Sequence, residues 1–131
     1  MDNLRKKLWV KYYLPSYLYA GLIFALSSYS LTLPPSMPKF SDKFIHLIEY
    51  GIFGFLLARS YFNATTKSYK KHFIALAFFT GLLWGLLDEF HQTFVPNRMF
   101  EYMDWVSDTA GTLTGIFIFL IWERITLGRS A

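Results

Sequence analysis

The chain has 131 residues, of which 53% are hydrophobic, 21% aromatic and only 17% charged, and it contains no cysteine. An ordinary soluble domain has about 25% charged residues, so this composition indicates a small integral membrane protein of one domain. The lack of cysteine excludes disulfides and thiol chemistry. The net charge of +4 does not indicate nucleic acid binding, because the basic residues flank apolar segments, as membrane orientation requires.

Four apolar segments follow one another, and each approaches the roughly 20 residues that a helix needs to cross a bilayer. We predict spanning helices at about 15–33, 43–62, 72–90 and 103–122. Pro15 suits a helix start, and Pro96-Asn97 predicts a turn between the last two helices. The predicted fold class is all-α: a single domain over 1–131 that forms an integral membrane four-helix bundle with short connectors.

Lysine and arginine are distributed unevenly over the connectors. Three of the 13, Lys39, Lys43 and Arg98, fall on one side of the predicted membrane, and the other ten fall on the opposite side, with both termini. Because positive residues stay in the cytoplasm, we expect a multi-pass protein of the bacterial cytoplasmic (inner) membrane with both termini inside. Seven of the nine acidic residues fall on the outer side. Acidic residues have little effect on topology, so they need another explanation.

The second predicted helix begins "SDKFIHLIEYG", in which Asp42, His46 and Glu49 share one face because they are spaced i, i+4 and i+7. At about 1.5 Å per residue, Glu49 lies roughly 10 Å deeper than Asp42. The His46–Glu49 pair has two interpretations, a functional site or a polar lock between helices. Asp42 is also a candidate helix N-cap.

The third predicted helix ends in "LLDEFHQ", which crowds Asp88, Glu89, His91 and Gln92 into little more than one turn. Asp88 faces His91 and Gln92 at i+3 and i+4. The two carboxylates lie at a helix C-terminus, where the helix dipole disfavours anions. This unfavourable placement indicates a function rather than a structural role.

The fourth predicted helix begins "MDWVSDTAGTLTG", in which Asp104 and Asp108 share a face with Gly111. Asp104 is another candidate N-cap, and the Gly111–Gly115 pair is typical of close helix contacts. Arg98, on the preceding connector, can bind a carboxylate or phosphate through two parallel hydrogen bonds. Ionisable groups inside a membrane cost roughly 2.5 kcal/mol or more and face the bundle interior or water, so we predict an outward-facing polar pocket lined by all three helices.

These segments resemble the VanZ-like family of small bacterial membrane proteins over about residues 27–118. The shared pattern is D-K-x2-H-x3-Y at 42–50, D-E-x-H-Q-x-F-x-P-x-R at 88–98 and D-x3-N-x2-G at 104–111, where this chain has Asp108 instead of the usual Asn. An amide can donate a hydrogen bond, whereas a carboxylate only accepts one. The resemblance implies low-level resistance to teicoplanin-type glycopeptides, as in the founding member, or a general role in the cell envelope.

The residues of these motifs make up the candidate site. The candidate ligand-binding residues are Asp42, His46, Glu49, Tyr50, Asp88, Glu89, His91, Gln92, Arg98, Asp104 and Asp108. For a divalent metal, the candidate ligands are His46, Glu49, Asp88, Glu89 and His91. The candidate catalytic residues are Glu89, His46, His91 and Asp88.

Two functions compete. The first is a non-catalytic pocket that binds an amphiphile, such as a membrane lipid, a lipid-linked cell-wall precursor or a lipoglycopeptide. The second is a metal-assisted or general acid–base enzyme that acts on an envelope lipid or glycan; the sequence leaves open whether the protein is an enzyme. Ion transport is less well supported, because the polar groups stop in the outer half of each helix. The glycines of the last helix also make a homodimer a candidate assembly.

Overall fold

The computed structural model describes residues 2–30, 36, 38 and 40–128, which are helical with short connectors and include no strand. The elements are α1 (Asp2–Leu8), η1 (Trp9–Tyr13), α2 (Leu14–Ser27), α3 (Ser41–Phe62), α4 (Lys67–Lys71), α5 (Phe73–Gln92) and α6 (Tyr102–Gly128). The predicted all-α class is therefore confirmed for this part of the chain. The end of the predicted first helix, at 31–33, lies outside the described residues, as do Lys39 and Arg129.

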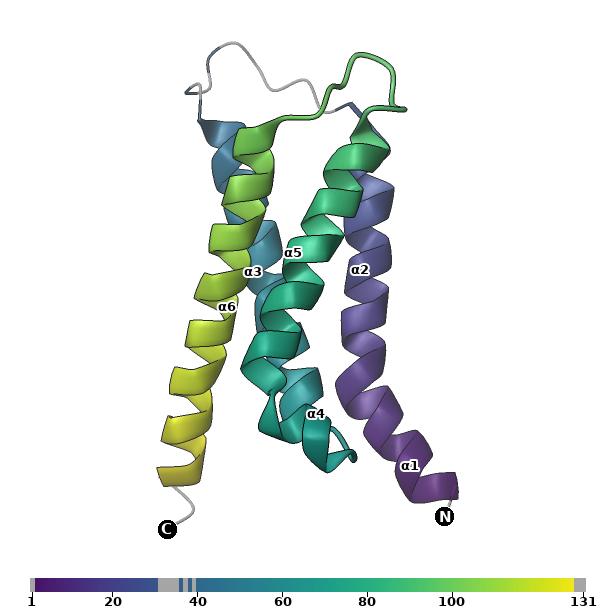
Figure 1. Ribbon diagram of the computed structural model, residues 1–131, viewed down its shortest axis with the longest axis vertical. Helices are drawn as coiled ribbons and strands as arrows, with labels where there is room; N and C mark the ends of the chain where they lie inside the picture. Colours follow the sequence, from purple (N-terminus) through teal and green to yellow (C-terminus); the bar gives the residue numbers. More distant parts are fainter. Residues whose placement is uncertain (1, 31–35, 37, 39, 129–131) are drawn as a thin grey trace.

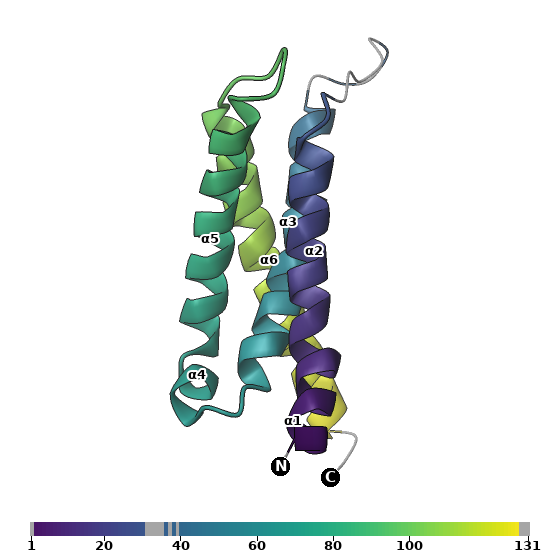
Figure 2. The same ribbon diagram turned by 90° about the vertical axis from the view of Figure 1, so that its right-hand side faces the viewer.

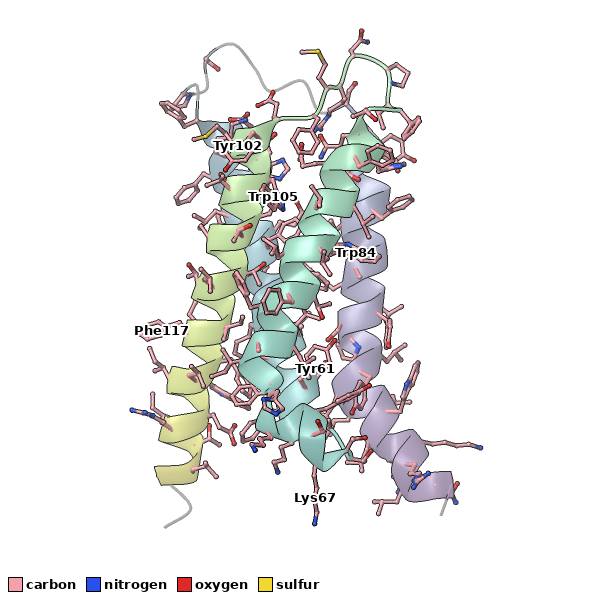
Figure 3. All side chains as sticks on the ribbon, viewed as in Figure 1. Tyr61, Lys67, Trp84, Tyr102, Trp105 and Phe117 are labelled. Carbon is pink, nitrogen blue, oxygen red and sulfur yellow. The ribbon has the colours of Figure 1, made fainter. Side chains whose placement is uncertain are left out.

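The long helices α2, α3, α5 and α6 run side by side in two roughly perpendicular views (Figures 1 and 2). The start of α1, the short α4 and the end of α6 all lie at one end of the molecule (Figure 1). We call this the basic end, because α1 and α4 carry the basic residues Arg5, Lys6, Lys7, Lys67, Lys70 and Lys71. The opposite end contains the end of α5 and the start of α6, and Tyr102 and Lys67 mark the two ends in Figure 3.

The first helix begins earlier than the sequence predicts, because α1 and α2 are continuous through the π-helical turn η1. Pro15 is the physical reason for the wider turn. Proline has no N–H to donate to the carbonyl of residue 11, and its ring would clash with that carbonyl in a regular α-helix. The side chain of Arg59 donates to the freed Lys11 carbonyl at 3.1 Å, which also ties α3 to this turn.

Glycines allow α3 and α6 to approach until their backbones touch. A Cβ atom on Gly115 would lie 1.9 Å from the Gly51 carbonyl oxygen, and one on Gly111 would lie 2.4 Å from that of Leu47. The predicted close contact of the Gly111–Gly115 face is therefore present, and its partner is α3 of the same chain. Since α3 covers these glycines, they are not free to pair with a second copy.

The connector between α5 and α6 contains the predicted Pro96-Asn97 turn. The Arg98 N–H donates to the Val95 carbonyl at 3.1 Å, and Asn97 has φ 62°. Asparagine tolerates this left-handed conformation better than most residues. Two predicted N-caps are wrong, because the N-cap of α3 is Phe40 and α6 already begins at Tyr102, so Asp42 and Asp104 lie within the first turns.

Large apolar side chains cover the outside of the long helices. Leu22 in α2, Ile48 in α3, Leu83 in α5 and Phe117 in α6 are each about half exposed, and Phe117 projects away from the other helices (Figure 3). Several carboxylates, in contrast, are buried between the helices. This distribution of apolar and acidic side chains is the opposite of that in a soluble protein, in which acidic residues are rarely buried.

Judged by length and composition alone, α5 and α6 can each cross a membrane, and these are the two such helices in the described residues. The 14 residues of α2 span only about 21 Å of helix, against a hydrocarbon core of about 30 Å. α3 has 22 residues but includes the charged residues Asp42, Lys43, Glu49 and Arg59. Three of these four belong to the polar end of the molecule, described next.

Candidate ligand-binding cavity

A cavity of about 660 Å³ opens at the end of the molecule opposite the basic end. Its walls come from α2, the first half of α3, the end of α5, the start of α6 and the connector at 97–101. Seven of the eleven candidate site residues line it: Asp42, His46, Glu49, Asp88, Gln92, Arg98 and Asp104. The helical spacing that placed Asp42, His46 and Glu49 on one face thus brings all three to the same cavity.

Lys43 links three carboxylates at the rim of the cavity. Its Nζ lies 2.8 Å from Asp42 Oδ2 and also contacts Asp104 and Glu101. Lys43 and Glu101 were not among the candidate site residues. Their sequence signal was present but weak: Lys43 follows Asp42 directly, and Glu101 lies one turn before Asp104.

His46 joins α3 to α6 deeper in the site. Its Nδ1 lies 2.9 Å from Asp108 Oδ1, within hydrogen-bond distance, and its Nε2 lies 3.7 Å from Asp104 Oδ2. The Asp108 side chain is 1% exposed and therefore almost wholly removed from solvent. Of the two sequence interpretations of the His46–Glu49 pair, a polar lock exists, but it joins His46 to Asp108 and leaves Glu49 out.

Gln92 is the centre of a network that connects α5 to the connector before α6. Its amide nitrogen donates to Glu89 Oε1 at 3.2 Å and lies 3.5 Å from Asp88 Oδ2, and its carbonyl accepts from Arg98 at 2.8 Å. Glu89 Oε2 accepts the backbone N–H of Glu101 at 3.0 Å. Glu89 is fully buried behind the cavity and holds the connector against the end of α5.

Arg98 does not contact a carboxylate within the described residues. Its guanidinium donates to Gln92 and, at 3.2 Å, to the carbonyl of Tyr29 at the end of α2. The predicted two-bond contact to a carboxylate or phosphate is therefore absent here, and Arg98 instead links the α5–α6 connector to α2.

The lining of the cavity also includes large, mainly apolar side chains. Tyr19 and Leu26 come from α2, and Ile45, Ile48 and Ile52 come from α3. The three isoleucines are also 45%, 50% and 47% exposed, so they belong to the outer apolar surface as well. The apolar wall of the cavity is therefore continuous with the outside of the helices.

His91 and Tyr50 are not part of the cavity. The His91 ring stacks on Phe24, with 4.0 Å between ring centroids, and its Nε2 lies 3.0 Å from the Ser28 hydroxyl. Tyr50 is fully buried and packs edge-on against Phe53. His91 thus contributes to the α2–α5 contact, and Tyr50 to the core.

Two sets of three side chains each bring possible metal-ligand atoms within 4.8 Å of one another. Asp42, Glu101 and Asp104 form one set, but all three contact Lys43. His46, Glu89 and Asp108 form the other set. Histidine and carboxylate are suitable ligands for zinc and related divalent ions. Two of the predicted metal ligands, His46 and Glu89, are in this set. The other three predicted ligands, Glu49, Asp88 and His91, are not in this set, and its third member, Asp108, was not predicted as a ligand.

The described residues form an all-helical fold with two helices long and apolar enough to cross a membrane, and acidic side chains line a cavity at one end. The chain belongs to the VanZ/LLP1 family, whose family model matches residues 5–123. The match extends further at both ends than the resemblance seen in the motifs alone. Comparisons with curated proteins and with solved structures gave no match.

Proposed function

We propose that α2, α3, α5 and α6 all cross the bacterial cytoplasmic membrane as one four-helix domain, with both termini in the cytoplasm and the cavity facing outward. The apolar side chains on the outside of all four helices support this arrangement, because they are suited to lipid rather than to water. The basic end supports the orientation, because lysine and arginine are enriched in cytoplasmic segments.

For α2, the continuous helix through η1 and α1 compensates for its short length. For α3, the charged residues near its start face the cavity rather than lipid, as ionisable groups in membrane helices usually do. Neither α2 nor α3 meets the length and composition expected of a membrane span by itself. The placement of α2 in the membrane therefore depends on η1 and α1, and that of α3 depends on the helices that enclose the cavity.

Within this arrangement, the protein binds an amphiphile whose head enters the cavity and whose apolar part lies along the isoleucine wall of α3. The observation that supports this function best is the cavity itself, which joins an acidic interior to an apolar surface continuous with the outside of the helices. Ligand sites usually combine an apolar lining with a few convergent polar groups. The candidate ligands are a membrane lipid, a lipid-linked cell-wall precursor and a lipoglycopeptide.

Membership of the VanZ/LLP1 family connects such binding with low-level teicoplanin resistance or with maintenance of the cell envelope. A protein that holds the drug, or the lipid-linked precursor that the drug recognises, reduces contact between the two. Neither mechanism requires turnover of a substrate.

Drug susceptibility in a sensitive Gram-positive host tests this function. We would express the wild type, Glu49→Gln and the control Glu123→Gln at matched membrane levels, and titrate teicoplanin beside vancomycin. Glu49 lines the cavity, whereas Glu123 is a carboxylate near the basic end, so the pair separates the cavity from a general loss of charge. We expect the wild type and Glu123→Gln to raise teicoplanin tolerance and Glu49→Gln to lose that effect.

If the wild type leaves tolerance unchanged, the resistance role is wrong and an envelope role remains. If all three chains raise it equally, the cavity does not cause the effect.

A second candidate function is supported by the close approach of His46, Glu89 and Asp108. A divalent ion held there would make a metal-assisted enzyme, because metals activate water or polarise a substrate oxygen. The metal content of protein purified without chelator measures this directly. Stoichiometric zinc or manganese in the wild type, lost in His46→Gln, favours the enzyme; metal-free protein that still changes drug tolerance excludes it.

A further inference from the structure

Two carboxylates that line the cavity, Glu49 and Asp88, form no salt bridge within the described residues. Asp88 is only 3% exposed, yet its Oδ1 has no hydrogen-bond partner, and the neighbours that hydrogen-bond its carboxylate, Ser27 and Gln92, are both neutral. Glu49 Oε1 is likewise buried without a partner. Within the described residues, the Glu49 carboxylate takes part in no hydrogen bond or salt bridge. Both side chains face the cavity.

The cationic groups nearby are already occupied. Lys43 contacts Asp42, Glu101 and Asp104. The Arg98 guanidinium donates to Gln92 and to a backbone carbonyl. His46 is paired with Asp108. Within the described residues, none of these basic side chains forms a salt bridge with Glu49 or Asp88. Arg98 and His46 attract the Glu49 carboxylate only from a longer distance.

A buried carboxylate is unfavourable unless it is paired and hydrogen-bonded. An ionised carboxylate accepts hydrogen bonds and cannot donate them, whereas a primary ammonium group carries a positive charge and three donors. An anionic head group would instead meet like charge from several acidic residues. A metal ion needs ligand atoms that converge, and neither of the two converging sets in the described residues contains Glu49 or Asp88.

We infer that the cavity recognises an amphiphile with a cationic, ammonium-bearing head, which Glu49 and Asp88 hold between α3 and α5. This inference depends on the proposed amphiphile binding and names the chemistry of its head group. Glu49 lies about 10 Å along α3 from Asp42, so the charge is held well below the rim. The apolar part of the ligand then lies against Ile48 and Ile52, which border Glu49 in the cavity lining.

The test uses three amphiphiles with the same dodecyl chain and different heads: dodecylamine, the neutral diol dodecylglycerol and the anionic dodecyl phosphate. Each is titrated as a radiolabelled probe into the full chain in neutral-lipid nanodiscs, and uptake by empty nanodiscs is subtracted. The variants are the double substitution Glu49→Gln/Asp88→Asn and the matched control Glu123→Gln. Circular dichroism and thermal unfolding show whether each variant remains folded.

We expect the wild type and Glu123→Gln to bind dodecylamine saturably and at least tenfold more tightly than the diol, with the phosphate weakest. In the double variant, the preference for the amine disappears and binding of the diol remains. If the single variants Glu49→Gln and Asp88→Asn each lose part of the preference while they stay folded, both carboxylates contribute.

Equal binding of the amine and the diol by the wild type would overturn the inference but leave amphiphile binding in place, because the site would then bind the chain without selecting a cationic head. An amine preference that persists in the folded double variant would also overturn it. If no probe binds saturably to the wild type, both the inference and the proposed function are wrong.

Discussion

Asp108 is the residue at which this chain departs from the VanZ-like pattern, which usually has asparagine there. The structure gives the carboxylate a definite role, since Asp108 Oδ1 lies 2.9 Å from Nδ1 of His46 and joins α3 to α6. An asparagine side-chain oxygen can accept the same hydrogen bond. The departure therefore changes the charge of the site and preserves the contact.

This role predicts different effects for two substitutions of similar size. Asp108→Asn keeps an acceptor for His46, so we expect the free energy of unfolding to change by less than about 1 kcal/mol. Asp108→Leu leaves the buried imidazole N–H without an acceptor, which costs roughly 1–3 kcal/mol. Denaturant unfolding in detergent micelles measures both values. Equal stability of the leucine variant and the wild type would show that this contact does not hold α3 to α6.

Glu49 and Asp88 show how a carboxylate can line a cavity without a salt bridge in its own chain. Each is placed by a regular helix, so its position is easy to predict. Its lack of a salt bridge is not easy to predict, because it depends on which residues the Lys43 and Arg98 side chains contact. The proposed ammonium-binding role therefore rests on the tertiary contacts of these residues and not on their positions in the sequence.

At the scale of elements, the contact between α3 and α6 positions the site. It brings His46 opposite Asp104 and Asp108, and it depends on glycines that let the two backbones meet. Small residues have this role in membrane helix pairs because lipid supplies no hydrophobic force between helices and close packing must compensate.

Gly115→Ala tests this contact. The new Cβ would lie 1.9 Å from the Gly51 carbonyl oxygen, an atom of the α3 backbone that cannot rotate away. The helices must separate, and we expect a loss of roughly 1–3 kcal/mol in the free energy of unfolding. The matched control is Gly21→Ala, which has nothing within 4 Å and should be neutral or more stable by up to roughly 1 kcal/mol. Equal effects of both substitutions would contradict the close packing.

For the whole molecule, the proposed orientation places the basic end in the cytoplasm and the connector between α5 and α6 outside. The chain has no cysteine, so single-cysteine variants report on one position each. We expect Asn97→Cys to react in intact cells with a maleimide that cannot cross the membrane. Lys67→Cys should react only after the membrane is permeabilised.

Asn97 and Lys67 are both exposed residues near the ends of α5, which makes the pair well matched for access to the reagent. Labelling of Lys67→Cys but not Asn97→Cys in intact cells would reverse the orientation and place the cavity in the cytoplasm. Labelling of both would mean that α5 does not cross the membrane in the proposed way.

Much of the candidate site followed from local regularity. A helix repeats every 3.6 residues, so Asp42, His46 and Glu49 had to share a face wherever α3 packed. Pro96-Asn97 predicted its turn because proline and asparagine each favour one of the required backbone conformations. The all-α class followed from composition and the length of the apolar segments.

His91 shows the limit of that reasoning. At about 100° per residue, His91 and Gln92 lie on either side of Asp88 on the helix surface, by roughly 60° and 40°. The sequence therefore predicts that both share a face of the helix with Asp88. The packing of α5 turns Gln92 towards Glu89 and Arg98 and leaves His91 against Phe24 of α2.

By itself, the sequence determined the helical class, the stripe of polar residues on each helix, the family, and the end of each helix that is polar, because composition and helical period act locally along the chain. Only the tertiary structure decided which polar residues meet. The rotation and closeness of the helices set the His46–Asp108 contact, the three carboxylates around Lys43 and the absence of a salt bridge to Glu49 or Asp88. These depend on side-chain packing between segments up to 62 residues apart, which no local pattern specifies.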